Sequence, residues 1–499
     1  MRISSSFAVL LVVLAFPASA AKWNIVPAFA VQTTYTDNLR LVPDEFAQGE
    51  LVTQLIPAIS ASANGKKLSF NFDYAPQLTF YARGLSEDDI FHVLNAVGTA
   101  ELADKLLFLD AGADVRQYDV TLQGAQSNNN VNVTGNRATV GTFYLSPYLS
   151  HQFGSSAVAL ARFTYSAWNS NDVQSFNNTA DSIELDLSSG PDYRVLTGNL
   201  NYRKANIDYD RQPDLAAEVV LATGRRLITP TLGLLAQVGD ENYERVVAGQ
   251  PTGVKDGGSR WGVGLEWVPS ARTQLTAAMG QRFFGDAYFL DIAHRTRLLT
   301  LRAGYSQDVT TTRTEFFTGA NGGAASYLDP LYCTKSADPE ACKQNLNSVV
   351  STRGLPLSTN GPVNFFSAAP FLQERFQVSV AMQGVRNVVI ATVFVDARKE
   401  LPGFSLLVDN NVDQNGINFA WNLPMGARTF WNLDATYDLN KFRDTGREDN
   451  VTTFGVGVTR QLQQRLTGSV NYRGQQRDSS VSLASYTEHS LRATLGMRF

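Results

Sequence analysis

Cysteines, histidines and long apolar segments are rare in this sequence. Each rarity argues against a class of site or of protein. Only two cysteines and four histidines occur among its 499 residues. No histidine has metal-ligand spacing to a second histidine or a carboxylate, and neither a Gly-x-Ser-x-Gly elbow nor a phosphate-binding glycine-rich loop is present. We therefore expect no metal, no cofactor and no catalytic residue, although a serine and a histidine could still meet in space.

The chain also lacks a strong charge of either sign and a helix-length hydrophobic segment. Its formal net charge is -4, which argues against the basic stripe typical of nucleic-acid-binding proteins. After residue 20 no run of about 18 apolar residues occurs, so we expect no transmembrane helix. No linker or change of composition divides the rest, which indicates a single domain over 21–499.

The first residues have the pattern of a cleaved secretory signal peptide. Arg2 gives a positive start, Phe7–Phe16 is apolar but too short to span a bilayer, and Pro17 precedes a small-x-small site at 18–20. No cysteine follows that site, which argues against a lipoprotein. The sequence therefore predicts a signal peptide over 1–20 and export of the mature chain.

The end of the chain alternates between apolar and polar residues. One face of the predicted last strand carries Phe499, Met497, Leu495 and Leu491, and the other carries Arg498, Gly496, Thr494, Arg492 and Ser490. The same alternation recurs at 431–439, 453–459 and 466–473. In a bilayer only a closed barrel pairs every backbone group of such strands. The pattern predicts an all-β transmembrane antiparallel β-barrel, with the apolar C-terminal residues as its assembly signal.

Connections of two lengths follow one another along the chain. Tight turns are expected at Asn64-Gly65, Asp104-Lys105, Gly154-Ser155, Gly190-Pro191, Ser270-Ala271, Gly384-Val385, Met425-Gly426 and Gln463-Gln464. Longer polar segments are expected at Val120–Arg137, Asn169–Asp181, Glu241–Ser259, Gly319–Val363, Glu400–Asn415 and Asp444–Asn450. Short periplasmic turns and long extracellular loops are typical of such barrels, and the count gives about 22 strands, within roughly 18–24.

Both cysteines fall in the longest polar segment, at about 319–363. Cys333 and Cys342 are expected to form a disulfide in an oxidising envelope compartment. The stapled segment could cap the barrel from outside or fold inward and constrict the lumen. A first strand near Trp23 to Thr36 would leave no room for the N-terminal plug of TonB-dependent transporters.

Several short stretches, spread over most of the chain, resemble a known family. They are Trp23 with Pro27, Thr34–Leu39, Leu51–Pro57, Ser188–Pro191, Asn201-Tyr202 with Asp208–Asp210, and Asp308–Arg313. In order and spacing the chain is similar to the outer-membrane barrels that accompany exosortase/PEP-CTERM systems and their exopolysaccharide loci. The resemblance implies a role in making or exporting surface polysaccharide, and it brings no catalytic residue, cofactor or defined substrate.

The predicted lumen carries charged residues near the C-terminus and one inward tryptophan. Arg473, Arg477, Arg492 and Arg498 fall on inward faces of the last two strands, with Asp434 and Asp438 on a nearby strand. These charges could pair across strands and stiffen the wall, or the arginines could guide an anionic polymer. Trp168 is expected to point inward, where it could stack on a sugar ring.

The sequence thus predicts a non-enzymatic barrel in the outer membrane of a Gram-negative bacterium. The favoured function is exopolysaccharide export or assembly through an aqueous or gated lumen. A general or substrate-selective diffusion porin is one alternative, and a plugged scaffold for surface proteins is another. Expected partners are outer-membrane lipid, the barrel-assembly machinery, exopolysaccharide and periplasmic export components, with no nucleic acid.

Overall fold

The structure is a computed structural model that describes most of the mature chain. The described residues are 21–127, 129–171, 177–247, 249–319, 366–367, 369–384, 386–402, 404 and 411–499. The predicted signal peptide 1–20, the cysteine pair Cys333 and Cys342, and the predicted long loop from residue 320 onward lie outside them.

Nearly all described residues belong to strands or to the connections between them. The first half of the chain forms β1 (Lys22–Thr36), β2 (Glu50–Asn64), β3 (Leu68–Tyr74), β4 (Gln77–Tyr81), β5 (Asp89–Phe91), β6 (Leu94–Ala103), β7 (Leu107–Asp119), β8 (Arg137–Phe153), β9 (Ala157–Ser170), β10 (Asn178–Ser189), β11 (Leu196–Tyr209) and β12 (Asp214–Thr229). The second half forms β13 (Leu232–Val247), β14 (Gln250–Ser270), β15 (Thr273–Arg282), β16 (Gly285–Arg295), β17 (Leu299–Thr310), β18 (Phe371–Gln383), β19 (Val388–Glu400), β20 (Val412–Pro424), β21 (Thr429–Phe442), β22 (Glu448–Gln461), β23 (Leu466–Ser479) and β24 (Tyr486–Arg498). The described helices are η2 (Asp44–Phe46), α2 (Thr312–Gly319) and η3 (Ser482–Ala484).

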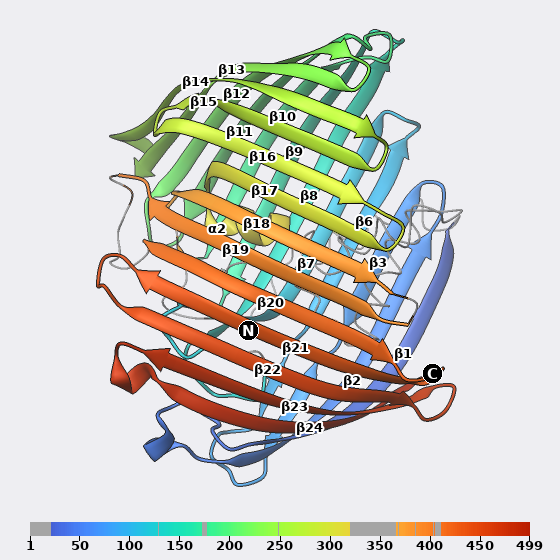
Figure 1. The fold of residues 1–499 in the computed structure, drawn as a ribbon, viewed down its shortest axis with the longest axis vertical. Coiled ribbons are helices and arrows are strands. Elements are labelled where there is room, and N and C mark those ends of the chain that lie inside the picture. The colour runs from blue at the N-terminus through green and yellow to red at the C-terminus, as the bar shows by residue number, and fades with distance from the viewer. Residues whose placement is uncertain are drawn as a thin grey trace.

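The strands form one closed antiparallel barrel (Figure 1). Outside β3 to β6, each strand pairs with its neighbours in sequence, and β1 pairs with β24 from Ala28↔Arg498 to Thr36↔Ser490, which closes the sheet. Both β3 and β4 pair with β2, so they are two pieces of one strand, interrupted at Ala75-Pro76. A proline cannot donate to a ladder, which accounts for a break there. With β5 and β6 counted in the same way, the barrel has 22 strands, and the predicted number is confirmed.

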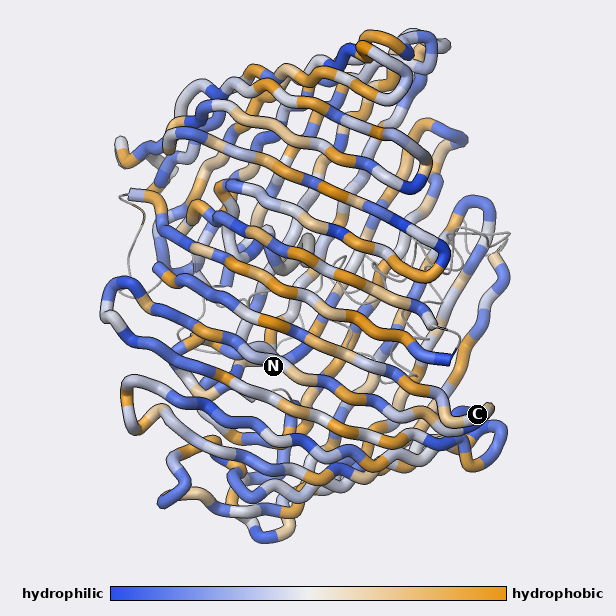
Figure 2. The backbone as a smooth tube through the Cα atoms, in the orientation of Figure 1, coloured by the Kyte–Doolittle hydropathy of each residue, from blue (hydrophilic) through white to orange (hydrophobic). Residues whose placement is uncertain are grey.

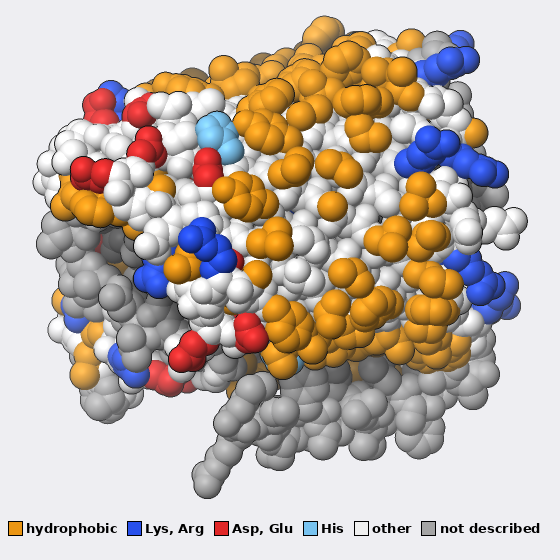
Figure 3. All heavy atoms as spheres, turned by 90° about the horizontal axis from the view of Figure 1, so that it is seen from below, with side chains coloured by type: hydrophobic (Ala, Val, Ile, Leu, Met, Phe, Trp, Pro, Cys, Tyr) orange, Lys and Arg blue, Asp and Glu red, His pale blue; other side chains and the backbone are white. Residues whose placement is uncertain are grey.

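Apolar side chains cover the outside of the barrel. Along each strand hydrophilic and hydrophobic residues alternate (Figure 2), and the outward set forms a broad apolar belt with charged side chains toward its two ends (Figure 3). Leu200, Ile417 and Leu491 are 47%, 52% and 51% exposed. An exposed belt of this extent belongs in lipid. Among the described residues, no helix is long and apolar enough to span a membrane.

The two ends of the barrel differ in their connections. All eight tight turns predicted from the sequence lie at one end, here the turn end, where 230–231 and 296–298 also connect strands. The opposite end, here the loop end, carries 37–49, the described residues between β7 and β8, and Leu401 after β19. The predicted loop Glu241–Ser259 was wrong, because these residues lie in the paired strands β13 and β14. Of the predicted loop Asp444–Asn450, residues 444–447 lie in a short connection at the loop end, and the last three residues begin β22. Polar strands can pair in water beyond the lipid, so polarity alone does not mark a loop.

Candidate functional site in the barrel lumen

The connection between β7 and β8 folds into the barrel instead of projecting away from it. This lumen loop, Val120–Asn136, leaves the sheet at Asp119 and returns at Arg137, which face each other across the β7–β8 ladder. Between these points its residues contact β20, β21, β23 and β24 on one side, and β2, β4 and the connection after β1 on the other. The lumen loop therefore crosses part of the barrel interior near the loop end.

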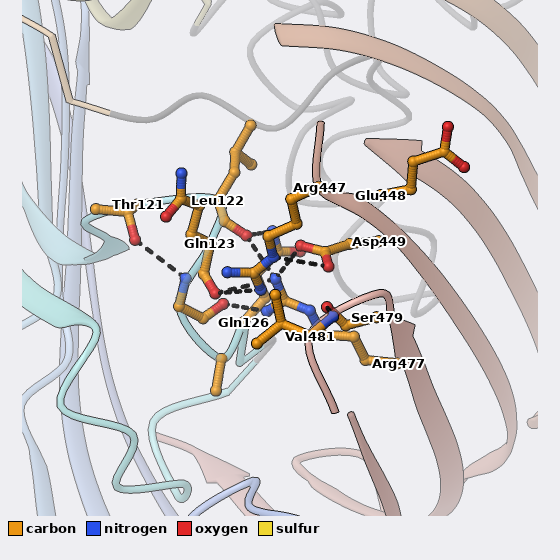
Figure 4. A network of polar contacts seen from close by, with 12 residues as sticks. Thr121, Leu122, Gln123, Gln126, Arg447, Glu448, Asp449, Arg477, Ser479 and Val481 are labelled. Carbon is orange, nitrogen blue, oxygen red and sulfur yellow. Dashed lines mark hydrogen bonds and ion pairs between the residues drawn. The ribbon is translucent and has the colours of Figure 1, made fainter. Parts of the chain in front are cut away.

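A buried arginine on β23 holds the first part of the lumen loop (Figure 4). Arg477 is 1% exposed, and its Nη2 donates to the carbonyl oxygens of Leu122 at 2.9 Å and Gln123 at 3.1 Å. Its Nη1 donates to the carbonyl oxygen of Gly124. A loop without regular structure leaves its carbonyls without ladder partners, and a guanidinium with five N–H donors can satisfy several of them at once.

An aspartate on β22 fixes that arginine and a second one. Asp449 is fully buried, and its Oδ2 accepts from Arg477 Nη2 at 2.5 Å, while its Oδ1 accepts from Arg447 Nε at 3.0 Å. Arg447 Nη2 also donates to the Gln123 carbonyl oxygen at 2.9 Å. A buried charge is costly unless it is paired and hydrogen-bonded, and here every charge has both kinds of partner. We call Arg447, Asp449 and Arg477 the clasp.

The second part of the lumen loop is held by side chains of β23 and β24. Gln475 Nε2 donates to the Gln126 carbonyl oxygen at 2.9 Å, and the Tyr486 hydroxyl donates to the same oxygen at 3.2 Å. Asn132 Nδ2 donates to Glu488 Oε1 at 2.9 Å. Apolar contacts complete the attachment: Leu122 packs with Val412 and Phe442, and Val131 packs with Leu39, Val52 and Tyr81.

Helix α2, which follows β17, joins two other parts of the wall. Glu315 forms ion pairs with Arg398 at 3.0 Å and with Arg375 at 3.3 Å, on β19 and β18. Arg313 donates to Ser166 on β9 and Asn178 on β10. Burial lowers the pKa of Arg313 to about 10, which still leaves it charged at neutral pH. The helix therefore lies inside the barrel between strands far apart in the sequence.

A third group of residues, an apolar cluster, also occupies the barrel interior near the loop end. Leu401 and Phe404, which follow β19, pack with Ala369 against Ala180, Ile207, Leu215 and Tyr243 on β10 to β13. Together with the lumen loop and α2, these residues fill part of the lumen near the loop end. Among the described residues, those at the turn end of the lumen are short connections. The described residues thus narrow the lumen near its loop end.

Comparison with known proteins agrees with this architecture. A family model described as "Putative beta-barrel porin 2" matches residues 427–499. The open form of the ferric-catecholate import receptor Fiu from E. coli K12 is similar at a TM-score of 0.51 and 9% identity, with 95% of this chain and 81% of that chain covered. The fold is that of an outer-membrane β-barrel.

Two further solved structures match this outer-membrane barrel with lower TM-scores than Fiu. The siderophore receptor PirA from Acinetobacter baumannii has a TM-score of 0.49 at 7% identity, over 95% of this chain and 80% of that chain. OccK2 (OpdF) from Pseudomonas aeruginosa has a TM-score of 0.36 at 8% identity, over 95% of this chain and 98% of that chain. No curated protein matches the chain.

The residues that the sequence placed in the lumen differ in their position on the barrel. Arg473, Arg477 and Arg492 share the inward face of β23 and β24 with the buried residues Gln475 and Ser490. Asp434 and Asp438 share the inward face of β21 with the buried residues Asn432 and Asn440. Arg498 lies exposed at the turn end, at the last position of β24. The apolar residues Leu491, Leu495, Met497 and Phe499 lie on the outer face, and their role in assembly stays a prediction.

Two details of the predicted site need correction. Within the described part of the chain Asp434 and Asp438 form no ion pair, and the partner of Arg477 is Asp449, which the sequence placed in a loop. The inward Trp168 is 3% exposed and packs against Phe366, with 5.6 Å between ring centroids, so its ring is not open to a sugar. The inward parity of Asp449, two residues before Val451 and four before Thr453, was the signal that could have found it.

Proposed function

We propose that this outer-membrane barrel is a porin-like channel whose passage is narrowed by the lumen loop. The observation that carries the proposal is the clasp, in which buried Arg477 binds three successive loop carbonyls and a buried carboxylate. Breaking such a buried network costs several kcal/mol, so the loop stays on the wall and restricts the lumen while leaving the barrel intact. The porin description of the matching family model supports the same class of function.

The solute we propose is a surface polysaccharide on its way out of the cell. This finer proposal rests on the resemblance to barrels of exosortase/PEP-CTERM systems, whose loci make and export such polymers. A lumen lined by amides, hydroxyls and both signs of charge can replace the hydration of a sugar chain. In this proposal the periplasmic partners would be components of the export system, and the channel itself would carry out no chemistry.

Single-channel conductance in a planar bilayer tests the channel. The variant replaces residues 120–136 by a two-residue Asn-Gly turn, which the facing positions of Asp119 and Arg137 can accommodate. We expect a steady conductance for the full chain and a larger one for the variant, because the restriction is gone. The control shortens the 480–485 connection, which the clasp does not use.

The host's own exopolysaccharide, added to one side, tests the solute. Block of the conductance by this polymer supports export, whereas conductance that ignores it favours a general diffusion porin. Correctly folded barrel that conducts in neither form would contradict the channel and leave the scaffold alternative.

A further inference from the structure

Three buried polar atoms on neighbouring inward positions lack a hydrogen-bond partner among the described residues. They are Nε of Arg473, Nε of Arg492 and Oγ1 of Thr34, and Thr34 is 1% exposed. Arg492 is directly opposite Thr34 in the β1–β24 ladder, and Arg473 is opposite Ser490, two residues before Arg492. Buried polar groups are nearly always satisfied, so three unsatisfied groups gathered at one place point to a ligand.

The two guanidinium groups can act on one ligand. Their residues occupy diagonal positions on adjacent strands, which places such residues about 7–8 Å apart, within reach of long side chains. Within the described residues neither guanidinium forms a hydrogen bond or an ion pair. Arg477 on the same face also has an unpartnered Nε, but its Nη1 and Nη2 are bound to loop carbonyls and to Asp449. Two adjacent cations and a hydroxyl form a set of donors suited to an oxyanion.

Two carboxylates moderate the charge of this pair without neutralising it directly. Asp434 shares a row with Arg473 across Gly455, and its carboxylate lies over that glycine, where a Cβ would collide with it. Glu488 lies near Arg473 but its Oε1 accepts from Thr36 and Asn132. Neither carboxylate is within ion-pair distance of Arg473 or Arg492 in the described structure. The negative charge of these two carboxylates lets Arg473 and Arg492 remain adjacent when no anion is bound.

The arginine pair lies directly beside the restriction, on its turn-end side. Gln475 and Glu488, which both bind the lumen loop, face each other across β23 and β24. The next inward pair toward the turn end is Arg473 with Ser490, followed by Asn471 with Arg492. A solute that enters the lumen from the turn end would meet these guanidinium groups immediately before the lumen loop.

We propose that Arg473, Arg492 and Thr34 form a binding site for the oxyanion of a solute, such as the carboxylate of an acidic sugar. The inference deepens the proposed function, on which its role in transport rests, by naming the charge of the solute. Each guanidinium can donate two parallel hydrogen bonds to a carboxylate, sulfate or phosphate, and the Thr34 hydroxyl can donate a further one. Neutral sugars lack the group that the site recognises.

Calorimetric titration of the full, detergent-solubilised barrel with glucuronate tests the site without any need for conduction. We expect glucuronate to bind and glucose not to bind. Arg473→Gln or Arg492→Gln should weaken binding about tenfold, and the double variant about a hundredfold, because charge-assisted hydrogen bonds are lost. Thr34→Val should weaken it less. The matched control is Arg460→Gln, which removes an exposed arginine at the end of β22, and should leave binding unchanged.

Sulfate and phosphate titrations separate a general oxyanion site from one that prefers carboxylates. Heat-modifiable migration shows whether the double variant is folded. If the folded double variant binds these anions as tightly as the wild type, the proposal is overturned. It is also overturned if the wild-type barrel binds none of the three anions. If the barrel conducts but binds no anion, only the proposed anion site is contradicted. Anion binding by a barrel that does not conduct retains the site and removes the channel.

Discussion

The charged residues of the lumen wall differ in whether they have an ion-pair partner. Arg477 and Asp449 are both buried and bonded to each other, while Arg473 and Arg492 share the same face without such a bond. The first pair supports structure, and the second is available to a ligand. The sequence left structural pairing and solute guidance open for the whole arginine row. The structure shows pairing for Arg477, and solute binding by Arg473 and Arg492 is our proposal.

Removal of the Asp449 carboxylate should destabilise the barrel. Asp449→Ala leaves two guanidinium groups, Arg447 and Arg477, without their shared anion, and we expect the free energy of unfolding to fall by about 3 kcal/mol. Urea unfolding of the barrel in lipid vesicles measures this change. The control Asp413→Ala breaks an exposed pair with Arg443, whose side chain is 48% exposed, and should cost less than about 1 kcal/mol. Similar losses in both variants would contradict a special role for Asp449.

At the scale of elements, the lumen loop is attached at two separate places. The clasp holds its first part, while Gln475 and the cluster around Val131 hold its second. Its partners are far away in the sequence, since Arg477 and Gly124 are separated by 353 positions. An interior loop held at both places narrows the lumen, and a loop held at only one should move.

Release of the first attachment should therefore produce a fluctuating channel. Arg477→Met keeps the length of the side chain but removes its donors, and we expect single-channel recordings to switch between a restricted and a wider level. Arg443→Met, at the exposed pair with Asp413, should record like the wild type. A single unchanged level in the Arg477 variant would show that the clasp does not hold the restriction.

At the scale of the whole molecule, the barrel separates a lipid-facing surface from a polar interior by strand parity. Leu200 on β11 is 47% exposed and lies opposite Leu187, which is 48% exposed, within the apolar belt. Its neighbour Asn201 lies on the opposite face of the strand, where its Nδ2 donates to Glu184 at 3.5 Å. Neighbouring residues of one strand thus meet lipid and lumen.

A positive charge should be tolerated at position 201, which faces the lumen, and not at position 200, which faces lipid. Leu200→Arg places a cation in lipid and should lower the free energy of unfolding by about 2–4 kcal/mol, the cost of an arginine near the bilayer centre. Asn201→Arg faces the lumen, beside Glu184, and should have little effect. Unfolding in vesicles measures both. Equal losses would mean that the belt is not in contact with lipid.

The fold was predictable because its signals are local. Period-2 alternation from residues such as Leu491 to Phe499 follows from the geometry of a strand, and tight turns such as that at Asn64-Gly65 depend on adjacent residues. These signals predicted the closed barrel, its strand number and the turn end. They misplaced Glu241–Ser259, because a strand can stay paired where its side chains are polar.

Whether a loop projects outward or folds inward was decided only by the tertiary structure. The alternation that divides lipid from lumen follows from the sequence alone, since each strand carries its own pattern. The position of the lumen loop depends on donors from β23, β24 and the connection before β22, and only barrel closure brings these segments near the end of β7 and the start of β8. The same closure sets Thr34 beside Arg492, residues at opposite ends of the chain, and so creates the proposed anion site.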